Sequence, residues 1–269
     1  MNFYRNMINF LPAILFILGL AIGSFLNALI YRLHTGDSIT KGRSKCPQCR
    51  HELSWKDLIP VVSYIVLKGK CRYCQKPISW QYPVVEVMTG ILFFLVTFVQ
   101  VGSWELFGVT TGNVLYLVFS LFIVSVMIVI FVYDLRHYLI LDKVLLPTAV
   151  IAFAAAVFLP QISLPWALVS SGVIGGFFLV LVLLSKERWM GWGDVKLGFL
   201  VGLILPWPLT IVVLLLAFVG GSVISLLLVG LKIKSMKDSV PFGTFLAAAT
   251  IITLIWGQAI ADWYLGLIM

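Results

Sequence analysis

Long apolar runs, separated by short polar links, constrain the fold of this chain more than any other feature. Hydrophobic residues make up 61% of its 269 residues and charged residues only 11%, whereas roughly a quarter of the residues in a soluble domain are charged. A helix of about 20 apolar residues spans a bilayer and satisfies its own backbone hydrogen bonds there. The composition therefore predicts an all-α polytopic membrane protein.

Eight apolar segments are candidates for membrane crossing, and we expect about eight transmembrane helices. The segments are Asn9–Tyr31, Pro83–Val101, Asn113–Tyr133, Val144–Leu159, Pro165–Leu184, Val195–Leu205, Leu209–Leu231 and Pro241–Leu265. The sixth would be only about 17 Å long as a helix. Its crossing is therefore tested by the charges that follow it.

The basic residues predict which loops are cytoplasmic, because Lys and Arg are enriched in loops on that side. Ten of the 19 lie within residues 32–82, which makes this segment the first cytoplasmic loop. With eight alternating spans, every other basic residue except Arg5 falls on the inner side, and both termini lie outside. If the sixth segment did not cross, the lysines of residues 232–237 would face outward. The net charge of +8 is thus explained by topology, and we expect membrane lipid but no nucleic acid as a partner.

All four cysteines of the chain lie in that first loop, as Cys46-Pro-Gln-Cys49 and Cys71-Arg-Tyr-Cys74. Two Cys-x-x-Cys pairs about 21 residues apart are typical of a tetrahedral four-thiolate zinc site. The cytosol keeps thiols reduced, which argues against two disulfides. Since nothing indicates an open coordination position, we expect a structural zinc that folds a loop too small to build its own core.

A carboxylate beside the sixth apolar segment is the first candidate for chemistry. Asp194 lies next to two glycines, Gly191 and Gly193. Burying a lone carboxylate in hydrocarbon costs several kcal/mol, so an acid at or inside the membrane face is a candidate for a functional site. Asp134 closes the third segment, and the charge pattern places both acids at the inner face. Two close carboxylates share one proton, so one can activate a water while the other protonates a carbonyl oxygen. The pair Asp134 and Asp194 predicts an aspartyl endopeptidase.

Other acids have simpler explanations. Asp142, beside Lys143, and Glu86 each lie near the start of an apolar segment, where a carboxylate is favourable at a helix N-terminus without any function. Asp142 nevertheless rivals Asp134, whose alternative role is a charge pair with Arg136 at the membrane face.

Small and polar residues in the first span predict close helix packing. Gly19 and Gly23 lie on one helix face, where a neighbouring helix can approach closely. Asn27 lies on the same side, one turn later. Its simpler role is an interhelical hydrogen bond, and its sharper role is contact with substrate.

Several motifs together are similar to a known family nearly from end to end of the chain. The matching segments are Gly23-Ser-Phe-Leu-Asn27, the paired Cys-x-x-Cys motifs, Gly69-Lys70, Tyr82-Pro-Val-Val-Glu86, Gly191-Trp-Gly-Asp194 and Pro241-Phe-Gly243. On these residues the chain resembles the bacterial type IV prepilin leader peptidase family, also called prepilin peptidase/N-methyltransferase. The chain departs from the family at Ile140-Leu141-Asp142, where a proline often stands in the middle.

The resemblance implies two reactions at the cytoplasmic face of the bacterial inner membrane. The first is cleavage of the leader of type IV prepilins or pseudopilins after a glycine, with Asp134 and Asp194 as the catalytic acids. The second is methylation of the new N-terminus with S-adenosylmethionine, for which Gly69 and Lys70 match residues linked to that activity. The chain itself shows no glycine-rich nucleotide loop, so methyl transfer is predicted from the family alone.

The predicted organisation has three parts: a first transmembrane helix at residues 1–31, a cytoplasmic zinc-binding domain at 32–82, and a membrane protease domain at 83–269. Two other functions are compatible with parts of the pattern. One is a general Gly-x-Gly-Asp intramembrane protease without methyltransferase activity. The other is a non-enzymatic membrane scaffold with a zinc-ribbon loop.

Overall fold

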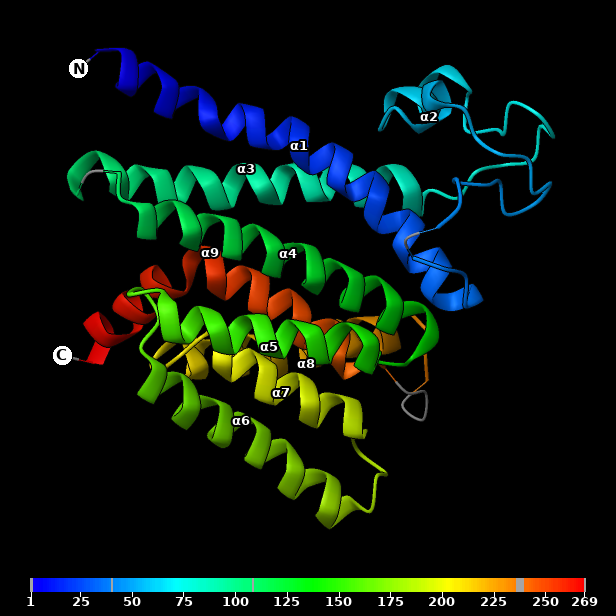
Figure 1. Cartoon of the computed structure of the whole chain (residues 1–269). Coiled ribbons are helices and arrows are strands. Elements are labelled where there is room, and N and C mark those ends of the chain that lie inside the picture. Colours follow the sequence, from blue (N-terminus) through cyan, green and yellow to red (C-terminus); the bar gives the residue numbers. More distant parts are fainter. Residues whose placement is uncertain (1, 40, 108, 236–239, 269) are drawn as a thin grey trace. The chain divides into compact units, whose positions relative to one another are not determined.

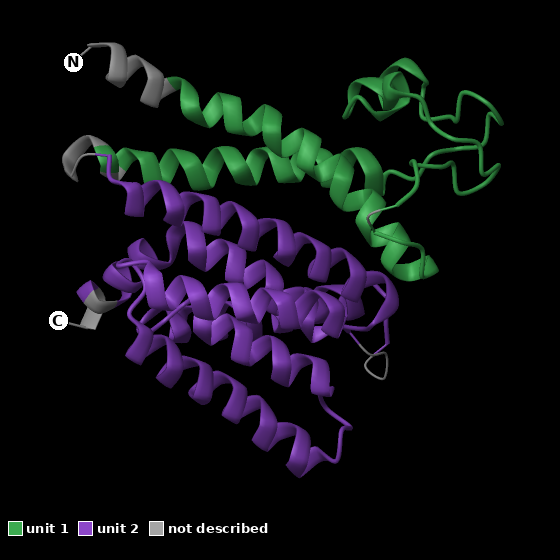
Figure 2. Cartoon of the chain, viewed as in Figure 1, with its two compact units in different colours: residues 1–108 green, residues 109–269 purple. Residues whose placement is uncertain are grey.

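The computed structural model describes residues 2–39, 41–107, 109–235 and 240–268. Contacts divide the chain into two compact units, residues 1–108 and 109–269, which Figure 2 distinguishes by colour. Every named element in the described ranges is a helix, and pairing of extended backbone there is limited to isolated bridges. The predicted all-α class is confirmed.

The first unit is built on two long helices, α1 (Asn2–Thr35) and α3 (Gln81–Phe107), which lie side by side in Figure 1. They approach closely because α1 presents glycine to α3. A Cβ added at Gly23 would lie 2.7 Å from the Cα of Glu86, and one at Gly19 would lie 2.8 Å from the Cα of Gly90. The predicted packing face of the first span is thus present, and larger side chains at either glycine would push the helices apart.

The polar loop between α1 and α3 contains two short helical turns, η1 (Trp55–Leu58) and α2 (Val62–Val66). The loop lies at the end of the helix pair where α1 ends and α3 begins (Figure 1). Arg32, in the last turn of α1, donates to the carbonyl oxygens of Ile39 and Gly42 at 2.9 and 2.8 Å. These bonds tie the first loop segment back to the helix from which it leaves.

The described part of the second unit forms six helices. They are α4 (Thr111–His137), α5 (Asp142–Phe158), α6 (Leu164–Ser185), α7 (Trp192–Ile204), α8 (Leu209–Gly230) and α9 (Phe242–Ile268). Helix α4 packs against α9 and α5, α7 packs against α6 and α5, and α8 packs against α9. Because α4 is apolar on every side, it can occupy the interior, and Ile123, Val124 and Met127 are fully buried there.

Six described helices are long and apolar enough to cross a membrane: α1, α3, α4, α6, α8 and α9. The chain is therefore a multi-pass membrane protein. Helices α5 and α7 coincide with two further predicted spans but have only 17 and 13 residues. Their crossing stays a prediction from the charge pattern, as does the cytoplasmic placement of Lys237, which lies outside the described residues.

The boundary between the two units falls near residue 108, whereas the predicted division separates residues 32–82 from everything that follows. In the structure the cysteine loop belongs to the same unit as the helices on both sides of it. The predicted three-part division by function stays a prediction, since compactness alone does not assign activities.

Candidate functional site

Asp134 lies in the last turn of α4. The helix begins where the Thr110 side chain accepts from the Asn113 N–H at 3.2 Å, and it ends at Tyr138, whose backbone is left-handed with φ of 54°. The N–H of Tyr138 donates to the Asp134 carbonyl at 2.9 Å. Only 4% of Asp134 is exposed, so its carboxylate needs partners from elsewhere in the fold.

The start of α9 supplies the partners of Asp134. The backbone N–H and the hydroxyl of Thr244 both donate to Asp134 Oδ2, at 2.7 and 3.1 Å. The preceding residue is glycine because no side chain fits there. A Cβ at Gly243 would lie 2.9 Å from Asp134 Oδ2 and 2.6 Å from Cδ1 of Ile140. Gly243 and Thr244 thus form a close-fitting anchor for one oxygen of Asp134.

Asp194 is the third residue of α7, where the N-terminal end of the helix favours a negative charge. Its Oδ2 accepts from the N–H of Gly191 at 3.2 Å, and its own N–H donates to the Gly191 carbonyl at 3.1 Å. The Gly-x-Gly-Asp sequence is therefore a helix start in which the acid folds back onto the turn. Asp194 is 9% exposed.

Close packing on α6 holds α7 in place. A Cβ added at Gly202 would meet the backbone of Ser171, and one at Gly198 would lie 2.5 Å from the ring of Phe178. The Ser171 hydroxyl also donates to the Phe199 carbonyl at 2.8 Å. These contacts leave α7 little freedom to shift, which keeps Asp194 in position.

The fold brings Asp134 and Asp194 together from different helices. Gly243, which lies against Asp134, and Gly193, which directly precedes Asp194, both lie against Ile140. Cδ1 of Ile140 would lie 2.6 Å from a Cβ added at Gly243, and Cβ of Ile140 would lie 3.1 Å from a Cβ added at Gly193. Within the described residues, the recorded hydrogen bonds reach Oδ2 of each acid. Oδ1 of each carboxylate accepts no hydrogen bond from the described part of the chain.

The rival acid Asp142 has a different partner. Both its carboxylate oxygens accept from Lys196 Nζ at 2.8 Å, and both side chains are about half exposed. This ion pair links the first turn of α5 to α7, two residues after Asp194. Asp142 therefore braces the helix that carries the candidate acid.

The four cysteine thiols form the second predicted centre. Their Sγ atoms all lie within 4.8 Å of one another, and those of Cys46 and Cys74 are 4.0 Å apart. A tetrahedral zinc with Zn–S bonds of about 2.3 Å separates its sulfur ligands by about 3.8 Å. The four free thiols therefore fit a zinc ion with little movement.

The two cysteine pairs have the same backbone turn. In each, the N–H four residues after the first cysteine donates to that cysteine's carbonyl, at 2.9 Å for Arg50 to Cys46 and 3.0 Å for Gln75 to Cys71. Arg50 and Gln75 both have φ of 57°. Two copies of one turn thus face each other across the sulfur cluster, as in a zinc ribbon.

The thiol pKa values reflect this crowding. Burial raises the pKa of Cys46, but the N–H groups of Cys49 and Gln48 outweigh that effect and lower it to about 7. The N–H of Lys76 favours the Cys74 thiolate, yet burial and the neighbouring thiols raise its pKa to about 11. Four thiolates can coexist here only with a compensating cation, which suits a divalent metal.

Asp57 joins the two halves of the loop outside the sulfur cluster. Its Oδ1 accepts from Arg72 Nε at 2.7 Å, and its Oδ2 accepts from the Ser54 hydroxyl at 2.8 Å and the Tyr73 hydroxyl at 3.3 Å. Burial raises the pKa of the Asp57 carboxyl, but the hydrogen bonds from Arg72 and Ser54 outweigh it and leave the pKa below its usual value.

Gly69 and Lys70, the residues predicted to serve the methyl donor, precede the second cysteine pair. Gly69 has φ of 69°, a conformation that other residues rarely adopt. A Cβ there would also lie 3.0 Å from the Tyr64 hydroxyl. Lys70 is exposed. The segment is thus a tight turn packed against α2, and its role in methyl transfer stays a prediction.

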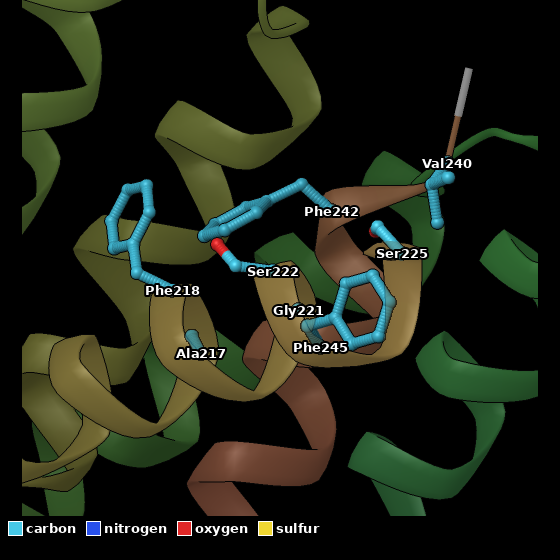
Figure 3. A pocket seen from close by; sticks show the side chains of 8 residues that line it. All are labelled: Ala217, Phe218, Gly221, Ser222, Ser225, Val240, Phe242 and Phe245. Carbon is cyan, nitrogen blue, oxygen red and sulfur yellow. The ribbon is translucent and has the colours of Figure 1, made fainter. Parts of the chain in front are cut away.

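A pocket of about 240 Å³ opens between α8 and the start of α9 (Figure 3). Its lining consists of aromatic and small residues: Ala217, Phe218, Gly221, Ser222, Ser225, Val240, Phe242 and Phe245. The rings of Phe218 and Phe242 are 4.9 Å apart. Because Phe242 directly precedes Gly243 and Thr244, the pocket opens beside the anchor of Asp134.

Comparison with known proteins assigns the chain to a family. Residues 17–100 match the bacterial peptidase A24 N-terminal domain, and residues 121–226 match the type IV leader peptidase family. A prepilin leader peptidase/N-methyltransferase of Legionella pneumophila is 30% identical, with 96% of this chain and 95% of the relative aligned. This chain belongs to the type IV leader peptidase family. The resemblance inferred from the sequence motifs is confirmed.

Two further relatives of this chain are also named prepilin leader peptidase/N-methyltransferase. The Aeromonas hydrophila protein is 30% identical over 94% of this chain and 93% of its own length, and the Aeromonas salmonicida protein is 29% identical over 96% and 94%. No solved structure matches the chain at a significant level.

Sequence reasoning missed Thr244 and Ile140, which the fold places at the carboxylates. Thr244 follows the Pro241-Phe-Gly243 segment that contributed to the resemblance, so that segment was the available signal. Ile140 stands in the segment where the chain departs from the usual family sequence, and no local pattern connects it to Gly193 or Gly243.

Proposed function

We propose that this protein is a membrane aspartyl endopeptidase that removes the leader of type IV prepilins or pseudopilins and then methylates the new N-terminus. The convergence of Asp134 and Asp194 carries the peptidase half of the proposal. The names of the relatives support both halves. Methyl transfer rests on the family alone.

Cleavage follows from two acids that share one proton. The ionised carboxylate takes a proton from a water, and the water oxygen attacks the carbonyl carbon of the leader glycine. The protonated carboxyl gives its proton to the carbonyl oxygen. When the tetrahedral intermediate collapses, the C–N bond breaks, the leaving amine takes a proton from one carboxyl of the dyad, and a hydroxyl proton of the intermediate returns to the other carboxylate. Thr244 and Gly191 each hold one oxygen of their acid, so the other oxygen can face the water.

In methyl transfer, the freed α-amine attacks the methyl carbon of S-adenosylmethionine after losing a proton. The carbon–sulfur bond breaks, and S-adenosylhomocysteine leaves. We place the methyl donor near Gly69 and Lys70, in the cysteine loop.

The cysteine loop would hold one structural zinc through Cys46, Cys49, Cys71 and Cys74. The metal supplies the cross-link that a loop of this size needs to stay folded. In this proposal no chemical step uses the zinc.

The family suggests a location in the bacterial inner membrane, and the charge pattern supports a dyad that faces the cytoplasm. Asp134 and Asp194 flank loops that carry Arg136, Lys186 and Arg188. Leaders that approach from the cytoplasm would therefore reach both carboxylates.

The proposal is tested with Asp134→Asn and Asp194→Asn. Each is expected to reduce leader cleavage by about 10²–10⁴-fold, because an amide can neither take nor give the required proton. The measurement incubates purified protein with a prepilin and S-adenosylmethionine, and determines the product's N-terminus by mass. Asp142→Asn is the matched control, since it removes an acid that braces α7 from outside the dyad; we expect less than a tenfold loss.

Normal cleavage by either dyad variant would remove that residue from the mechanism and favour the scaffold alternative. A prepilin that lacks the leader glycine separates the remaining alternative. The leader peptidase should leave it uncut, whereas a general intramembrane protease should cut it.

A further inference from the structure

Glu86 is a buried carboxylate that the proposed cleavage reaction does not use. It is 7% exposed and lies in the second turn of α3. A Cβ added at Gly23 of α1 would lie 2.7 Å from its Cα, and its Oε2 accepts from the backbone N–H of Val61 in the cysteine loop at 2.8 Å. Three separate segments of the first unit, α1, α3 and the loop, therefore meet at this one residue.

The residue that Glu86 holds has an unusual backbone. Val61 has φ of 62° and ψ of −49°, and the N–H of Val62 donates to the Pro60 carbonyl at 2.6 Å. This is a γ-turn with positive φ, a rare and strained conformation that a β-branched residue is especially unlikely to adopt unaided. Such strain persists only when surrounding contacts impose it. At Val61, one such contact is the hydrogen bond that its own N–H donates to Glu86.

The γ-turn at Val61 is followed by α2 and then by Gly69-Lys70, the segment predicted to serve the methyl donor. Val61 is the residue from which α2 starts. Tyr64 of α2 then packs its hydroxyl against Gly69, and the Gly69 N–H donates to the Tyr64 carbonyl at 2.9 Å. The Tyr64 ring also contacts Trp80, 5.4 Å between centroids, just before α3. The position of Gly69 and Lys70 thus depends on where α2 begins.

We propose that Glu86 is a positioning residue for methyl transfer: it latches the Val61 turn to the α1–α3 pair and so sets the place of α2 and of Gly69-Lys70. The inference rests on the proposed function, in that it assumes methyl transfer in this loop. A latch needs a hydrogen-bond acceptor at this position but no negative charge. A group that handled a proton or bound the substrate amine would need the charge.

The experiment therefore compares Glu86→Gln with Glu86→Ala in the full-length protein. Glutamine keeps a carbonyl oxygen that can accept from Val61, whereas alanine keeps none. We expect Glu86→Ala to retain cleavage within about twofold and to lose at least tenfold in methylation, and Glu86→Gln to retain at least half of the methylation. Both products are resolved in one mass measurement of the pilin N-terminus. Thr97→Ala is the control, because Thr97 is a buried residue of α3 whose hydroxyl donates to the Phe93 carbonyl of the same helix.

Hydrogen exchange gives a second measurement that does not depend on activity. The amides of residues 61–69 should exchange at least tenfold faster in Glu86→Ala than in the wild type or in Glu86→Gln. If the wild type cleaves but does not methylate, the methyl-transfer half of the proposed function fails, while the exchange data still decide whether the latch exists.

Three results would overturn the inference. Equal methylation loss in Glu86→Gln and Glu86→Ala would show that the charge is needed. Parallel loss of cleavage and zinc in Glu86→Ala would show a general folding role. Unchanged exchange in Glu86→Ala would show that Val61 is held by something else.

Discussion

At the scale of single residues, the geometry of the candidate dyad depends on a position without a side chain as much as on the hydrogen bonds to its carboxylates. Asp134 is buried, and its anchor Thr244 reaches it only because position 243 has no side chain. A hydrogen bond to a charged group contributes about 1.5–3 kcal/mol, so both donors of Thr244 matter. The geometry of one carboxylate is thereby set by a glycine and a threonine 110 residues away.

Gly243→Ala is therefore expected to impair cleavage without changing any acid. Its Cβ would compete for space with Oδ2 of Asp134 and with Ile140, and a displacement of about 1 Å at a catalytic group can cost about 10²-fold. The measurement is kcat for leader cleavage. Gly172→Ala is the control, since a Cβ there meets nothing within 4 Å. Wild-type kcat in Gly243→Ala would refute the anchor.

At the scale of elements, the cysteine loop is held together by a cluster of four thiols that fits a metal ion and by the hydrogen bonds of Asp57. The sulfur cluster joins the two Cys-x-x-Cys turns at one point, and Asp57 joins them at another through Ser54 and Arg72. The pKa of the Asp57 carboxyl is lowered in the fold. Its stabilising contribution is therefore complete above the ordinary carboxyl pKa of about 3.9 and is lost as the pH falls through the lowered value.

Asp57→Asn should then make the loop less stable at neutral pH, and its difference from the wild type should vanish in acid. Protonation of the thiols releases zinc from both proteins, so the difference between the two curves isolates Asp57. The measurement is the exchange rate of the loop amides against pH in both proteins, from pH 7 down to pH 2, because the lowered pKa lies below the ordinary value.

Glu52→Gln serves as the control in the same loop, because the exposed Lys45–Glu52 pair should contribute little. A difference between Asp57→Asn and wild type that stayed constant down to pH 2 would contradict the role of the ionised carboxylate.

At the scale of the whole molecule, the membrane topology decides which face the dyad serves. Six of the described helices are long enough to cross, while α5 and α7 are short. If neither short helix crossed, Lys186, Arg188 and Lys196 would lie outside, against the usual distribution of basic residues. The eight-span topology keeps them inside.

Reporter fusions distinguish the two topologies. A fusion after Gln161 should report an external position with eight spans and a cytoplasmic one with six, and a fusion after Arg188 should report the reverse. Alkaline phosphatase is active outside the cytoplasm and a fluorescent protein folds inside it, so each site is read twice. An external Arg188 would refute the eight-span topology and the cytoplasmic placement of Asp194.

The features that could be predicted from the sequence are those that depend on local sequence patterns. Apolar runs, paired Cys-x-x-Cys motifs and the distribution of lysines and arginines each carry their physical meaning within a few dozen residues. They were enough for the helical membrane class and for the cysteine cluster. The motifs were also enough for the family.

Contacts between distant segments were decided by the tertiary structure alone. Thr244 meets Asp134, Lys196 meets Asp142, and Glu86 meets Val61 across separations of 110, 54 and 25 residues. In a chain that is apolar almost throughout, many helix pairings satisfy hydrophobicity equally well, so the pattern cannot choose between them. Glycine-sized gaps and the few buried polar groups select one packing, and that choice exists only in three dimensions.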